Sequence, residues 1–158
     1  MDQDERPAYS AIKGLSYLDA VINESMRVTP PVPRSIRIAS KASVIDGVYI
    51  PKGTLLPITS RAINMDPHVW GPDAHEFKPE RWFNLPEKYD RTFSMVTFIA
   101  GAHACIGRTM SYLEMKAVIC MLVANFRFEP ITPDQSPIMD ALITMKPKDG
   151  LPLKVFPV

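Results

Sequence analysis

The 158-residue sequence contains only two cysteines, carries a formal net charge of +1 and has no long apolar run. A near-neutral chain shows no sign of a nucleic-acid partner. The longest apolar run, residues 117–124, falls far short of the ~20 residues of a membrane-spanning helix. The charged residues 1–6 lack the apolar stretch of a secretory signal. We therefore expect an intracellular chain without a membrane segment.

Proline is the residue in excess, at 16 of 158 positions, about twice the usual share. Two proline-free windows remain, residues 8–29 and 87–129. Proline removes a backbone donor and clashes with the preceding helical turn, so long helices must lie in these windows. This distribution excludes an all-helical bundle and a regular βαβ array.

The first window predicts a helix over Ser16–Val28, in which Ser16 and Asp19 fit a capping box. The proline-rich stretch that follows predicts strands separated by turns. The expected elements are strands at 35–38 and 54–58, a hairpin over 44–50 around Asp46-Gly47, a short helix near 61–63 and an irregular segment over 66–86. We expect Trp70, Phe77, Trp82 and Phe83 to be buried anchors of that segment.

The second window predicts the longest helix, over residues 106–125. The sequence becomes apolar on every side after Ala117, which predicts a deeply buried second half. The end of the chain predicts a hairpin that pairs residues 141–146 with 151–156 around Asp149-Gly150.

The two cysteines, Cys105 and Cys120, are placed too far apart to form a disulfide. Fifteen residues along one helix span ~22 Å, whereas bridged Cα atoms lie within ~7 Å. Cys120 lies in an apolar run and has the surroundings of a small core residue. Neither belongs to a C-x-x-C pair, which argues against a structural zinc site.

Cys105 differs because it stands between Gly101 and Gly107, just before the predicted helix. A helix N-terminus favours a thiolate, and glycines allow a flat group to approach the backbone. An ordinary loop-to-helix turn and a thiol enzyme with His103 as its base remain open, although nothing orients that base. A haem-iron ligand fits best, because it needs one thiolate, a glycine-lined loop and a long helix.

Residues 98–107, FIAGAHACIG, resemble the haem-binding loop of cytochrome P-450 monooxygenases, whose usual form is F-x-x-G-x-R-x-C-x-G. Phe98, Gly101, Cys105 and Gly107 match this pattern, and His103 stands where the family usually has arginine. The resemblance implies that Cys105 is the axial ligand of haem iron, that these residues form the cofactor loop, and that His103 contacts a propionate.

Two smaller features of this region bear on the resemblance. Ile99 replaces a frequent glycine of the family's loop and is expected to stiffen it. Glu114, seven residues after Gly107, matches the family's pattern.

Glu24-Ser25-Met26-Arg27 resembles the family's E-x-x-R helix, and Pro79-Glu80-Arg81-Trp82 resembles its P-E-R-F segment. Helical periodicity by itself predicts an exposed Glu24–Arg27 pair. The resemblance implies instead a covered structural triad of Glu24, Arg27 and Arg81. Residues 66–70 match the family's D-P-x-x-W pattern, and Arg37 falls where a propionate contact is expected.

The resemblance implies a mainly α fold with small β-sheets (α+β), in which residues 1–158 form the C-terminal third of a cytochrome P-450 domain. The oxygen-activating motif A/G-G-x-D/E-T does not occur in the sequence. The implied function of the complete enzyme is haem-thiolate monooxygenation of a small organic substrate, with electrons from a reductase and no catalytic residue beyond the haem ligand. Relatives are often anchored to the endoplasmic reticulum. The alternative is a non-catalytic, truncated or degenerate haem-binding or interaction module.

Overall fold

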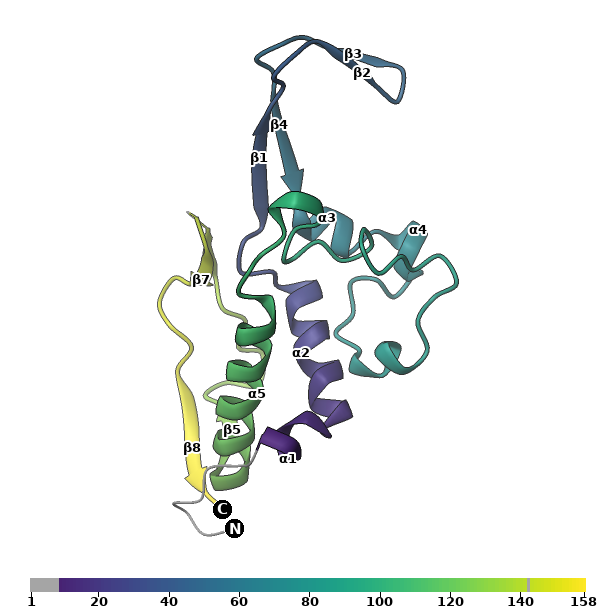
Figure 1. Ribbon diagram of the computed structural model, residues 1–158. Coiled ribbons are helices and arrows are strands. Elements are labelled where there is room, and N and C mark those ends of the chain that lie inside the picture. Colours follow the sequence, from purple (N-terminus) through teal and green to yellow (C-terminus); the bar gives the residue numbers. More distant parts are fainter. Residues whose placement is uncertain (1–8, 142) are drawn as a thin grey trace.

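The computed structural model describes residues 9–141 and 143–158. Two long helices, α2 (Ser16–Val28) and α5 (Arg108–Asn125), lie side by side, and the short helix α1 (Tyr9–Lys13) packs against α5 (Figure 1). The described strands form two-stranded antiparallel sheets. The expected class of helices combined with small sheets is confirmed.

Helix α2 has the predicted bounds, but its caps differ from the prediction. Leu15 is the N-cap and makes no side-chain capping bond, and the Asp19 carboxylate pairs instead with Lys116 Nζ of α5 at 2.8 Å. The predicted capping box is therefore wrong, because the Asp19 carboxylate forms an ion pair between the two helices instead of a capping contact. The helix ends at Thr29, before Pro30, as the restriction on residues preceding proline requires.

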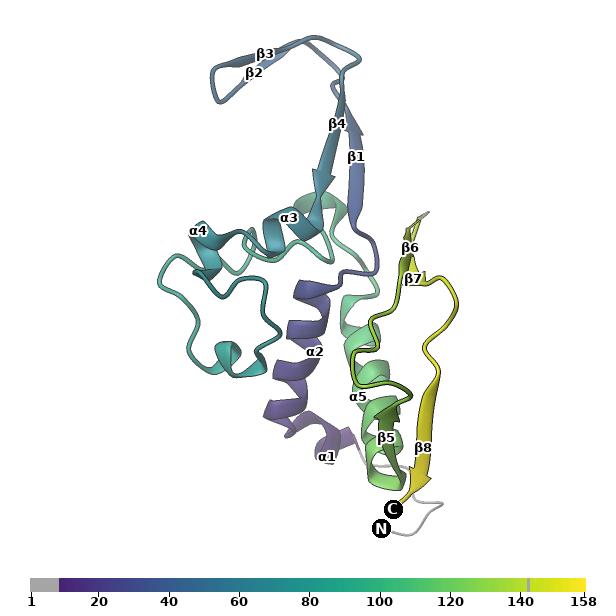
Figure 2. The same cartoon turned by 180° about the vertical axis from the view of Figure 1, so that it is seen from behind.

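Strands β1 (Arg34–Ile38) and β4 (Leu55–Thr59) form an arm that projects away from the helices (Figures 1 and 2). The hairpin β2 (Ser43–Ile45) and β3 (Val48–Ile50) lies at its tip. Asp46 and Gly47 both have positive φ, 47° and 76°, which a two-residue hairpin turn of type I′ requires. The predicted hairpin is confirmed.

The chain then wraps around α2 through α3 (Ser60–Asn64), α4 (Pro67–Trp70) and the 3₁₀ helix η1 (Pro79–Phe83). Trp70 is 2% exposed and anchors this segment. Phe77 and Phe83, expected to be buried, are 54% and 52% exposed. That expectation was wrong. Trp70 and the ion-paired side chains on α2 hold this segment against the helix, so the two phenylalanine rings are not needed as anchors.

The C-terminal strands pair differently from the predicted hairpin. Strand β8 (Leu153–Pro157) pairs with β5 (Phe126–Pro130), which directly follows α5, and β6 (Met139–Ala141) pairs with β7 (Met145–Pro147). The β5–β8 ladder has Pro130 and Pro157 at its ends, where a missing N–H does least harm. The predicted pairing would have brought Pro152 into a ladder.

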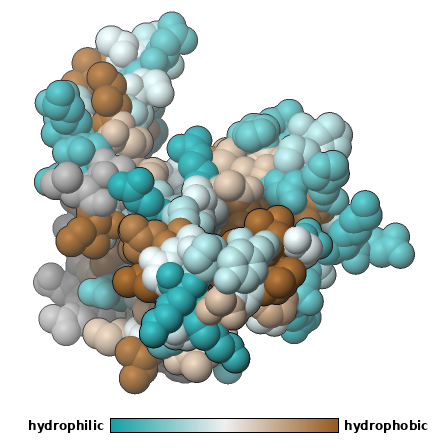
Figure 3. Space-filling model, turned by 90° about the horizontal axis from the view of Figure 1, so that it is seen from above, coloured by the Kyte–Doolittle hydropathy of each residue, from teal (hydrophilic) through white to brown (hydrophobic). Residues whose placement is uncertain are grey.

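The second half of α5 is more exposed than its apolar sequence predicts. Val118, Leu122 and Val123 are 51%, 41% and 60% exposed. Among the described residues, α5 contacts α1, α2 and β5, and these elements cover only part of its circumference. Apolar patches are also visible on the face shown in Figure 3. Within the described ranges, no helix combines the length and apolar character that crossing a membrane requires.

Candidate haem site and its supporting ion cluster

A buried carboxylate on α2 holds two arginines. Glu24 accepts from Arg27 Nε and Nη2, both at 2.8 Å, and from Arg81 Nε at 2.9 Å. Glu24 and Arg27 are 0% exposed and Arg81 is 8% exposed. The structure therefore brings together all three members of the expected triad, and the exposed pair predicted from helical periodicity is wrong. Segment 71–83 closes over this face of α2, which the helical pattern does not encode.

Glu24 has two further donors, so the cluster exceeds the expected triad. The Lys78 backbone N–H and Trp82 Nε1 donate to it at 2.8 and 3.0 Å. Burial disfavours the charged carboxylate, but the hydrogen bonds from Arg27, Lys78 and Arg81 outweigh this effect and hold the pKa of Glu24 below its ordinary value. Glu24 is therefore an anion that joins α2 to η1.

Arg27 uses its remaining N–H groups on backbone carbonyls. Its Nη1 donates to Asn64 O and Ala74 O at 3.0 and 2.6 Å, and its Nη2 to Glu76 O at 3.0 Å. The guanidinium carbon lies 5.0 Å from the centre of the Trp70 ring. Lysine could not reproduce this set, because the contacts need a planar group with several fixed donors.

Asn64 connects the end of α2 to the segment before Cys105. Its amide nitrogen donates to Arg27 O at 3.3 Å and to Thr97 Oγ1 at 2.8 Å, and its amide oxygen accepts from Val96 N at 2.9 Å. The Thr97 hydroxyl in turn donates to Met26 O at 2.8 Å. Nothing in the local sequence marks Asn64, so it could not be predicted.

The Cys105 loop has a tight backbone. The Cys105 N–H donates to Phe98 O at 2.8 Å, and the 3₁₀ turn η2 (Gly101–His103) lies between them. Gly101 has φ +73°, a conformation that glycine adopts without strain. Ile99 also has a positive φ, 57°, which is an outlier for a β-branched residue. The substitution of the family's frequent glycine by Ile99 therefore introduces backbone strain.

Helix α5 begins at Arg108, two residues later than predicted, so Cys105 lies in the loop itself. Its thiol is exposed. Among the described residues, no hydrogen bond joins Cys105 to His103. The structure therefore gives no support to a thiol–imidazole catalytic pair.

Cys105 lines a cavity of about 390 Å³ beside α2 and β1. Phe98 and His103, two of the expected cofactor residues, also line this cavity. Ile99 also lines it, and the other lining residues, none of which was expected to hold a cofactor, are mainly apolar or small: Met26, Pro31, Val32, Ser35, Ser60, Thr97, Ser111 and Met115. A mainly apolar cavity bordered by one soft sulfur ligand suits a flat macrocycle such as haem.

The remaining expected cofactor residues lie outside the wall of this cavity. Arg37 is half-buried on β1 and donates through Nη1 to Ser35 Oγ at 2.7 Å. Ser35 lines the cavity, so Arg37 contacts a wall residue. Gly107 caps α5, and a Cβ added there would stand 3.8 Å from the Cys105 sulfur, an ordinary contact. A side chain would therefore fit at position 107, whereas the positive φ at position 101 favours glycine.

Several known proteins are similar to this chain over most of its length. The family model described as Cytochrome P450 matches residues 1–153. The chain is 44% identical over 147 residues to Cytochrome P450 monooxygenase 128 of Postia placenta, a match that covers 82% of the chain and 27% of the relative. It is 35% identical to Cytochrome P450 monooxygenase sphH of Aspergillus fumigatus, with 94% and 28% covered. Human Cytochrome P450 3A5 is 33% identical, with 94% and 30% covered.

These matches extend over most of the chain but over less than a third of each relative. The chain spans 27%, 28% and 30% of the length of these three proteins. A family match over nearly all of the chain and sequence identities above 30% establish the relationship. The chain belongs to the cytochrome P450 family.

Proposed function

We propose that this chain binds haem through the Cys105 thiolate and forms the haem-ligating, C-terminal part of a monooxygenase. The observation that carries the proposal is the exposed residue Cys105 in the wall of a mainly apolar cavity of about 390 Å³. When bound, haem supplies the O₂ activation from which one oxygen atom is inserted into an organic substrate.

The residues of the chain would hold the cofactor in distinct ways. Cys105 would provide the sulfur ligand, and Phe98 would provide an aromatic part of the same wall. His103 lines the same cavity and can donate a ring N–H to a propionate. Among the described residues, Arg37 Nε and Nη2 have no hydrogen-bond partner, so they are available to a second propionate oxygen.

The ion cluster around Glu24 supports the site without touching the cofactor. It fixes α2 against η1, and Asn64 and Thr97 connect the last turn of α2 to the segment that leads into Phe98. We infer that the cluster is a positioning device for the Cys105 loop. The sulfur can ligate iron well only if its loop is held by such supporting contacts.

We further propose that residues 1–158 form part of one cytochrome P450 domain. The relatives are more than three times longer than the chain, so the complete activity needs segments that this sequence does not contain. In the complete protein we expect a small organic substrate and an electron-donating reductase as partners.

The thiolate ligation can be tested on the purified chain by adding haem, reducing it and binding carbon monoxide. We expect the red-shifted Soret band of a thiolate-ligated haem, and we expect its loss in Cys105→Ser. Cys120→Ser is the matched control and should keep the band, because Cys120 lies outside the cavity.

The result that would overturn the proposal is a Cys105→Ser variant that keeps the band, or a parent chain that folds but never shows it. Either outcome would favour a non-catalytic module in which the family's motifs serve only packing.

A further inference from the structure

A second cavity, of about 450 Å³, lies behind the Cys105 loop. Phe98 and Ile99 contribute to the walls of both cavities, and Gly101 and Ala104 border only the second. Cys105 and His103 are absent from its lining. The second cavity is thus distinct from the candidate haem site, and an inference about it goes beyond the proposed function.

The second cavity has aromatic walls. Trp82, Tyr89 and Phe98 line it, and the Trp82 and Tyr89 rings lie edge to face at 83°, with their centres 6.1 Å apart. Trp70, behind them, holds the Tyr89 ring at a centre distance of 5.2 Å. A flat ring can pack against such walls, because aromatic faces and edges attract one another in offset and perpendicular arrangements.

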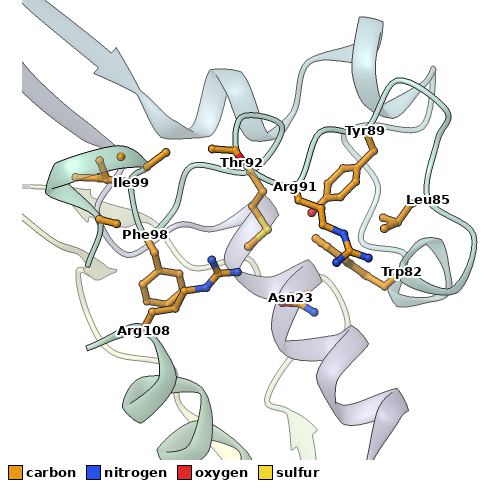
Figure 4. Close-up of a pocket in the computed structure, with 13 residues that line it drawn as sticks. Asn23, Trp82, Leu85, Tyr89, Arg91, Thr92, Phe98, Ile99 and Arg108 are labelled. Carbon is orange, nitrogen blue, oxygen red and sulfur yellow. The ribbon is translucent and has the colours of Figure 1, made fainter. Parts of the chain in front are cut away.

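The same cavity is positively charged. Arg91 and Arg108 line it, and no acidic residue does so among those described. Figure 4 shows Arg108 beside Phe98 and Arg91 near Tyr89 and Trp82, so the two arginines lie at different places around one space. Among the described residues, neither arginine takes part in an ion pair.

Asp90, next to Arg91 in the sequence, and Asp19 both have other partners. Asp90 accepts the backbone N–H groups of Thr92 and Phe93 at 2.7 and 2.9 Å, and Asp19 pairs with Lys116. Burial raises the pKa of the Tyr89 hydroxyl; the charges of Arg108 and Arg91 oppose that rise, and the charge of Asp90 adds to it. Both guanidiniums therefore act on the same part of the cavity.

Arg108 is exposed and stands at the start of α5, next to the Phe98 ring. Its guanidinium carbon lies 5.9 Å from the centre of the Phe98 ring, and it is the first residue of an 18-residue helix. The positive end of the helix adds to the charge of the arginines. A cation would be repelled from this cavity. An anion with an apolar ring would be attracted by the arginines and would pack against the aromatic walls.

We propose that this second cavity is a binding site for a small aromatic anion, with its charged group on Arg91 and Arg108 and its ring among Trp82, Tyr89 and Phe98. The chemistry recognised is a carboxylate on one edge of a planar apolar ring. Guanidinium groups suit this charge, since they form paired hydrogen bonds with carboxylates.

The test is calorimetric titration of the full chain with naphthoate, compared with the neutral analogue naphthylmethanol. We expect saturable binding of naphthoate and at least tenfold weaker binding of the neutral compound, about the effect of one charge-assisted hydrogen bond. Arg91→Gln and Arg108→Gln should each weaken naphthoate binding about tenfold. Arg34→Gln, an exposed arginine of β1 outside the cavity, is the matched control and should leave it unchanged.

A second variant tests the location independently of charge. Thr92 is exposed and lines the cavity, so Thr92→Trp should fill the space and abolish binding without disturbing buried groups. The proposal is overturned if naphthoate does not saturate, if the neutral analogue binds equally well, or if the Arg91→Gln/Arg108→Gln double variant binds like the parent. These readouts do not involve haem, so their failure is distinguishable from failure of the proposed function.

Discussion

Glu24 shows how far a single residue's environment can depart from what its helix predicts. Its carboxylate is completely buried and accepts from two arginines, a backbone N–H and an indole. Burying charges is costly, and they remain together only because each has its partners. Removing Glu24 would leave the buried Arg27 without an acidic partner.

At this scale we predict that Glu24→Gln lowers the free energy of unfolding by about 3–5 kcal/mol, the usual effect of breaking a buried ion pair. The amide would keep the shape but leave the buried Arg27 without an anionic partner and Arg81 with only Asp73, 3.3 Å from its Nη1. Urea unfolding followed by circular dichroism measures this change. Glu76→Gln is the control and should change stability by less than about 0.5 kcal/mol, since Glu76 is exposed. Equal effects at both positions would contradict the assigned role.

Ile99 has a strained backbone conformation. Its φ of 57° lies in the left-handed region, which costs an L-residue about 1–2 kcal/mol. We therefore predict that Ile99→Gly stabilises the chain by about 1 kcal/mol in urea unfolding. Ile106→Gly is the control: Ile106 is fully exposed in the same loop and does not have a positive φ, so we expect no gain there. A destabilised Ile99→Gly would show that its wall contacts outweigh the strain.

The helices α2 and α5 differ in burial in a way that their apolar content does not predict. Helix α2 is buried on its apolar face and also at Glu24 and Arg27, while α5, which is more apolar, exposes much of its second half. Periodicity predicts which residues share a face, but the elements available to cover that face decide burial. Only part of α5 is covered by described elements.

This contrast predicts unequal effects of truncation on the two helices. Ile22→Ala in α2 should cost about 2–5 kcal/mol, because Ile22 is 2% exposed and a cavity would remain. Val123→Ala in α5 should change stability by less than about 0.5 kcal/mol, because Val123 is 60% exposed. The measurement is the urea midpoint of each variant. A large loss at Val123 would mean that another surface covers α5 in solution.

Local sequence signals predicted the elements well and their partners poorly. The α2 bounds, the β2–β3 hairpin and the C-terminal limit of α5 follow from proline, Asp-Gly and helical spacing. The pairing of β8 with β5 and the burial of Arg81 depend on segments distant in sequence. No local pattern encodes such contacts, since they depend on which segments meet in space.

The whole molecule has little fully buried apolar material for its length. Among the described residues, the buried apolar side chains are Ile12, Ala20, Ile22, Met65, Trp70 and Ala74. The ion cluster around Glu24 sits among several of them. Its charge state should therefore affect the stability of the entire chain.

At this scale we predict that stability falls with acid in a way that Glu24 governs. Glu24 has an ordinary pKa of 4.5, and its pKa in the folded chain is lower. A depressed pKa adds stability that is present above the unfolded value and is lost as pH falls through the folded value. Urea midpoints measured from about pH 6 to about pH 3 should drop steeply in the parent and less steeply in Glu24→Gln. Parallel curves would contradict the prediction.

The sequence by itself determined the family motifs, the two helices in the proline-free windows, the hairpin turn and the candidate ligand Cys105. These follow from local chemistry, because backbone preferences and residue spacing act over a few positions. Only the tertiary structure decided that Lys78 N and Trp82 Nε1 also donate to Glu24, that Asn64 links α2 to the Cys105 loop, and that Arg91 and Arg108 share a cavity. The reason is that burial and charge pairing depend on which distant segments close over each other.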